Sequence, residues 1–111
     1  VEVSDCIQKQ FSAGYVLDPH TATCFKVLDQ AAVPGMPCVI CSTAEWSKFS
    51  PTMVAALTGE TGLADQAALA RMAELANVSI SPTIANLFEK PIQHTAVVSP
   101  QAIETEILAF L

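Results

Sequence analysis

Apolar residues recur at a helical spacing of three and four along most of the chain, and several of these stretches begin at prolines. Four prolines follow Asp or Ser, which favour the N-cap position, and proline itself favours the first helical turn. These pairs are Asp18-Pro19, Ser50-Pro51, Ser81-Pro82 and Ser99-Pro100. The pattern predicts helices over residues 5–12, 19–32, 46–58, 63–76, 82–89 and 100–111.

Two short segments depart from the helical period. Residues 38–43 form a mainly apolar run after Pro37, which is typical of a parallel-type strand buried on both faces. Residues 94–98 predict a second, short strand. Because two brief strands do not make a stable sheet, we expect the missing strands to come from another part of a longer chain. The expected fold class is therefore α/β and helix-rich, with residues 1–111 forming a single unit without an internal boundary.

The composition is apolar and acidic. Of the 111 residues, 51% are hydrophobic and only 14% are charged, which suggests that some faces meet another domain or subunit. The net charge of −6 argues against binding to nucleic acid and to anionic membrane surfaces. No apolar run approaches the roughly 20 residues that a membrane-spanning helix needs, so we expect no membrane partner.

The four cysteines include a Cys-x-x-Cys pair formed by Cys38 and Cys41. In a strand, residues three apart point to opposite faces and lie about 10 Å apart, whereas a disulfide needs Cα atoms within about 7 Å. No second Cys-x-x-Cys or His pair supplies the other ligands of a zinc site, so we expect no metal. We predict buried, reduced thiols, which favours a cytoplasmic setting.

Two motifs carry the most specific chemical information. Residues 14–22 read G-Y-V-L-D-P-H-T-A and open a helix, while residues 41–44 read C-S-T-A and are followed by Lys48-Phe49. In this order and at this spacing the motifs resemble the C-terminal part of threonine synthase, a pyridoxal 5'-phosphate (PLP) enzyme of fold type II. The resemblance covers residues 14–49 firmly and the rest loosely. It implies that a longer chain converts O-phospho-L-homoserine and water to L-threonine and phosphate.

Thr43 is the candidate cofactor-binding residue. It lies at the carboxyl end of the predicted strand, where open α/β sheets place their ligands. The resemblance implies that its hydroxyl donates a hydrogen bond to the pyridine nitrogen of PLP, which a hydroxyl can do when that nitrogen is unprotonated. The alternative is that Thr43 caps the helix that follows it.

Asp18, His20 and Thr21 open the helix of the first motif. Free backbone donors and the helix dipole favour anions at such a position. Asp18 is most simply the N-cap residue, and His20 is expected to be neutral because a positive charge is disfavoured in the first turn. The resemblance places these three residues in the vicinity of the active site, but it assigns none of them a catalytic step.

The chain lacks the groups that hold most of the cofactor in this family. The Schiff-base lysine lies outside it, because none of Lys9, Lys26, Lys48 and Lys90 has the family's sequence setting, and no Gly-rich phosphate loop occurs. We therefore expect this chain alone neither to bind PLP covalently nor to make threonine. Its expected partners are the remainder of the enzyme chain and a small-molecule substrate.

One departure from the family pattern and one alternative function stay open. The family commonly continues S-T-A with H-P-A-K-F, whereas this chain has Glu45-Trp46-Ser47 before Lys48, a change that leaves Thr43 untouched. The alternative function is a free-standing, acidic helical interaction module without catalytic activity. The helix-rich pattern and the lack of a nucleophile–base pair favour that alternative.

Overall fold

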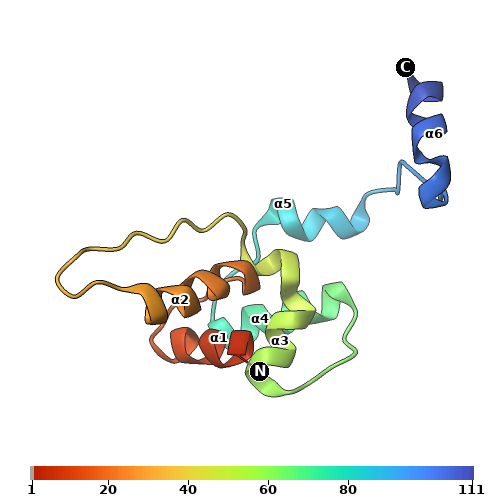
Figure 1. The fold of residues 1–111 in the computed structure, drawn as a ribbon. Coiled ribbons are helices and arrows are strands. Elements are labelled where there is room, and N and C mark those ends of the chain that lie inside the picture. Colours follow the sequence, from red (N-terminus) through yellow and green to blue (C-terminus); the bar gives the residue numbers. More distant parts are fainter. Residues whose placement is uncertain (1) are drawn as a thin grey trace.

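Helical segments begin at the four prolines that the sequence marks. In the computed structural model, which describes residues 2–111, proline occupies the first or second position of four helical segments (Figure 1). These are α2 (Pro19–Ala31), α3 (Ser50–Thr58), α5 (Pro82–Ala85) and the 3₁₀ turn η3 (Pro100–Ala102). Of these four, α2 has a side-chain cap, supplied by Asp18. The prediction of these helix starts is confirmed, except that at α3 Ser50 is already helical and Phe49 is the N-cap residue.

The remaining helices lie close to the predicted ranges, although α1 begins at Glu2 instead of Asp5 and α4 at Asp65 instead of Leu63. They are α1 (Glu2–Ser12), η1 (Trp46–Phe49), α4 (Asp65–Ala76), η2 (Asn86–Glu89) and α6 (Ile103–Phe110). The 3₁₀ turn η1 leads directly into α3, and α3 ends at Gly59. Gly59 has φ of 79°, a left-handed backbone conformation that glycine adopts without steric cost.

The core lies among the first four α-helices. Helix α1 packs against α2 and α3, and α3 packs against α4 (Figure 1). Burial of their apolar side chains is the main favourable term that holds this bundle together. The buried hydrophobic residues are Ile7, Leu17, Ala22, Met53, Val54, Ala56, Ala68, Leu69 and Met72.

The two predicted strands are not present, so the α/β prediction is wrong. Residues 38–43 belong to a long extended connection between α2 and η1 that runs outside the bundle (Figure 1). Val39 in this connection is 87% exposed, and Val97 in the predicted strand 94–98 is 96% exposed. A strand needs hydrogen-bonding neighbours, and no segment between residues 2 and 111 pairs with either stretch. Over the described residues the fold is helical.

The same exposure corrects the prediction of buried thiols. Cys38 and Cys41 are exposed because the connection that carries them lies on the surface, and Cys24 on α2 is exposed as well. Cys6 on α1 is partly buried. All four cysteines are free thiols.

The C-terminal third of the chain extends away from the bundle. Helix α6 stands well apart from α1–α4 in Figure 1, and its apolar stripe is exposed rather than buried. Exposed apolar residues at this end are Ile103, Ile107, Leu108, Phe110 and Leu111. None of the helices between residues 2 and 111 has the length and apolar character of a membrane span.

Candidate functional site

The start of α2 is built around the carboxylate of Asp18. Its Oδ1 accepts hydrogen bonds from the backbone N–H groups of His20 at 2.9 Å and Thr21 at 3.3 Å, and its Oδ2 accepts from the Thr21 hydroxyl. Asp18 is only 1% exposed and has an extended backbone, as an N-cap residue does. The N-cap prediction for Asp18 is confirmed.

Opposing effects act on the pKa of Asp18. Burial raises it by disfavouring the charged form, whereas the hydrogen bonds from the Thr21 hydroxyl and from the backbone N–H groups of Thr21 and His20 lower it. The hydrogen bonds outweigh burial, so the pKa lies below its ordinary value. The carboxylate is therefore charged at neutral pH, and that charge is held inside the fold.

This lowered pKa predicts an acid-sensitive stability. The unfolded chain binds a proton at Asp18 more readily than the folded chain does. The contribution of the charged Asp18 carboxylate to the free energy of unfolding is therefore fully present above the unfolded pKa of about 3.9. It is lost as the pH falls through the lower folded pKa. We expect Asp18→Asn to reduce the free energy of unfolding at neutral pH and to flatten its dependence on pH below about 4. Urea unfolding of the wild type and of Asp18→Asn across this pH range tests this expectation. Identical slopes of the free energy of unfolding against pH in the two proteins would contradict it.

A hydroxyl contact joins the two motifs that lie far apart in the sequence. Thr21 Oγ1 on α2 lies 3.2 Å from Ser42 Oγ in the connection to η1. The Ser42 hydroxyl, which has one proton, also lies 3.0 Å from the backbone carbonyl oxygen of Ala44. The D-P-H-T-A and C-S-T-A segments therefore meet at the start of α2.

Thr43 directly follows Ser42 and is exposed, so its hydroxyl can take a partner from outside this chain. The N-cap residue of the following turn η1 is Glu45, with no side-chain cap hydrogen bond. The alternative in which Thr43 caps the next helix is therefore not found. The role of Thr43 toward a cofactor stays a prediction.

His20 lies beside the same carboxylate and against an aromatic ring. Its Nδ1 is 3.5 Å from Asp18 Oδ1, and its ring centroid is 4.8 Å from that of Phe49 with an interplanar angle of 53°. The imidazole is otherwise largely exposed. Phe49 of the Lys-Phe pair thus belongs to this cluster, which sequence reasoning did not predict. Ser42 was also missed, although its place next to Thr43 in the motif was a usable signal.

Few groups near the start of α2 could meet a cofactor. Thr43 offers an exposed hydroxyl, whereas Lys9 and Lys26 form ion pairs with Asp29 at 3.8 Å and Glu2 at 3.9 Å across α1 and α2. No Gly-rich phosphate loop lies near Thr43 in the sequence. Across residues 2–111 no group of three metal-binding side chains is close enough to hold an ion.

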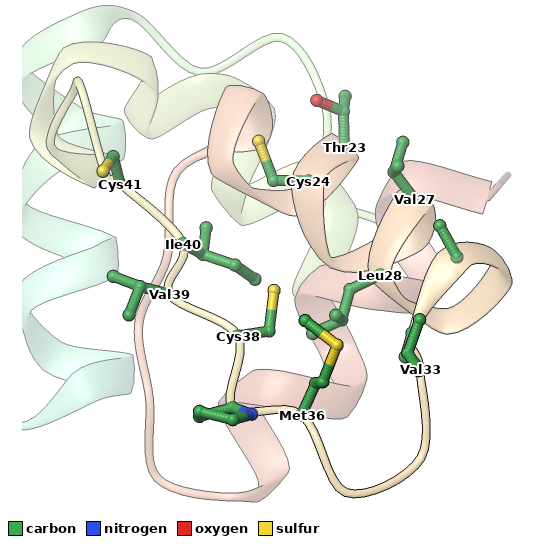
Figure 2. A pocket seen from close by; sticks show the side chains of 13 residues that line it. Thr23, Cys24, Val27, Leu28, Val33, Met36, Cys38, Val39, Ile40 and Cys41 are labelled. Carbon is green, nitrogen blue, oxygen red and sulfur yellow. The ribbon is translucent and has the colours of Figure 1, made fainter.

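An apolar groove lies along the other part of the same connection. It is formed between one face of α2 and residues 33–41, and its volume is about 530 Å³ (Figure 2). Leu28 of α2 faces Cys38 and Ile40 of the connection across it. The groove shows that the connection leaves an apolar face of α2 accessible.

Part of the chain is similar to proteins named threonine synthase-like 1. Those of Homo sapiens and Mus musculus are each 46% identical to it over 46 residues, which is 41% of this chain and 6% of the relative. The Pongo abelii protein is similar to the same extent. The chain thus spans only about 6% of the length of the curated relatives that it matches. It matches no protein-family model and no solved structure. The similarity supports a threonine synthase-related family.

Proposed function

We propose that this chain is part of a longer PLP-dependent enzyme of the threonine synthase type. The observation that carries the proposal is the contact between Thr21 Oγ1 and Ser42 Oγ, which brings the two motifs together at one site. Similarity over 46 residues to threonine synthase-like proteins supports it independently. The proposed reaction converts O-phospho-L-homoserine and water to L-threonine and phosphate.

Within that site, the residues of this chain bind and orient. The Thr43 hydroxyl donates a hydrogen bond to the unprotonated ring nitrogen of PLP, the cofactor that supplies the electron sink for the reaction when it is bound. Asp18 keeps a fixed negative charge beneath the site and orients the Thr21 hydroxyl. The lysine that carries the cofactor and the phosphate-binding loop belong to the remainder of the longer chain.

An acidic interaction module without catalytic activity is the second candidate. The exposed apolar residues of α6, which stands apart from the bundle, favour it because such surfaces mark contacts with another protein. Under this proposal the contact between Thr21 and Ser42 only stabilises the connection after α2.

The gene separates the two proposals. The enzyme proposal expects a reading frame that continues upstream of the first codon of this chain and encodes a lysine that carries PLP. The longer protein should purify with bound PLP and release phosphate from O-phospho-L-homoserine, and replacement of that lysine by alanine should abolish both. A start codon at the first residue of this chain, or a longer protein without PLP, would favour the interaction module.

A further inference from the structure

The hydroxyl of Thr21 has its single proton committed. It donates to Asp18 Oδ2, so Thr21 Oγ1 can only accept a hydrogen bond from Ser42, whose oxygen is 3.2 Å away. Ser42 has one proton and two acceptors within reach, Thr21 Oγ1 and the carbonyl oxygen of Ala44. Because Asp18 takes the Thr21 proton, Thr21 Oγ1 can act toward Ser42 only as a hydrogen-bond acceptor.

The two ends of this contact differ in their surroundings. Asp18 and Thr21 are 1% and 4% exposed, so the acceptor is fixed in the bundle. Ser42 is exposed and belongs to the long connection that runs outside the bundle. When the Ser42 proton is directed at Thr21 Oγ1, the hydrogen bond holds a surface segment against a packed helix, as a precise binding group requires.

We propose that Thr21 is a positioning residue whose hydroxyl holds Ser42, and with it the adjacent Thr43, against the start of α2. The inference rests on the proposed function, in which Thr43 contacts the cofactor. Without the Thr21 hydroxyl, the one acceptor that remains within reach of the Ser42 proton is the carbonyl oxygen of Ala44, and the position of Thr43 relative to α2 is less well fixed.

The tie itself is tested in this chain by replacing Thr21 with valine, which keeps the β-branched shape and removes the hydroxyl. The {¹H}-¹⁵N nuclear Overhauser effects of residues 42–44 are expected to fall, which reports increased nanosecond motion, and Thr21→Ser is expected to restore them. Thr23→Val is the matched control, because the Thr23 hydroxyl bonds to the His20 carbonyl oxygen of its own helix at 2.6 Å. Unchanged values in Thr21→Val, or an equal fall in Thr23→Val, would overturn the proposal.

The role in the reaction is tested in the longer enzyme. Thr21→Val is expected to lower kcat about tenfold with a smaller change in KM, because a displaced group loses effectiveness in the transition state, and Thr21→Ser should recover most of the loss. Normal turnover in Thr21→Val while Thr43→Val is impaired would overturn the positioning role. Normal turnover in both Thr21→Val and Thr43→Val would overturn the proposed function instead. The mobility of residues 42–44 would still show whether the Thr21 hydroxyl holds Ser42.

Discussion

Replacing Met72 with alanine is expected to lower the free energy of unfolding by about 2–5 kcal/mol. Met72 is fully buried on α4, in the cluster where α4 meets α3, so its truncation removes apolar burial and leaves a cavity. Alanine favours a helix at least as well as methionine, so the loss reports packing rather than helix propensity. Urea unfolding followed by circular dichroism measures it.

Met36 provides the matched control. It lies in the connection after α2 and is 67% exposed, so Met36→Ala is expected to change the free energy of unfolding by less than about 0.5 kcal/mol. A loss of less than about 1 kcal/mol in Met72→Ala, or equal losses in the two variants, would contradict the core described above.

Helix positions could be predicted from the sequence because local chemistry determines them. An N-cap residue followed by proline restricts the backbone at one point in the chain, whatever the tertiary surroundings. All four such pairs, from Asp18-Pro19 to Ser99-Pro100, lie at helix starts. Asp18 also forms the side-chain cap hydrogen bonds, because it is buried and has Thr21 beside it.

The strands could not be predicted correctly because a strand is not a local structure. The apolar run at residues 38–43 satisfies the sequence pattern of a buried strand, but pairing and burial depend on other segments. Between residues 2 and 111 no such partner segment is present, and the run is an exposed extended connection. The prediction that Cys38 and Cys41 are buried depended on that strand. Because the strand is not present, the prediction of buried thiols is wrong as well.

The candidate site was predictable in part. The first motif pointed to Asp18 as a cap, and the resemblance implied that both motifs belong to one active site. The structure places Ser42 of the second motif against Thr21 of the first. The tilted ring contact between His20 and Phe49 was not predictable, because it depends on how η1 packs against the start of α2. Spacing in the sequence does not determine such a contact.

In the longer enzyme, Thr43→Val is expected to reduce turnover roughly ten- to a hundredfold while the protein stays folded. Valine keeps the β-branched shape and removes only the hydroxyl, so the ring nitrogen of the cofactor is left without a partner at a cost of about 1–3 kcal/mol. Thr61→Val is the control, because Thr61 is also exposed but lies in the connection between α3 and α4. Its turnover should match that of the wild type, and thermal unfolding of each variant verifies that it is folded.

The turnover of Thr43→Asp, compared with that of Thr43→Val, decides whether Thr43 donates a hydrogen bond to the cofactor. If Thr43 donates to an unprotonated ring nitrogen, aspartate cannot replace it, because a carboxylate is an acceptor that forces a different protonation state on the ring. We expect the Asp variant to turn over more slowly than the Val variant. Near wild-type turnover in Thr43→Asp would contradict the cofactor contact.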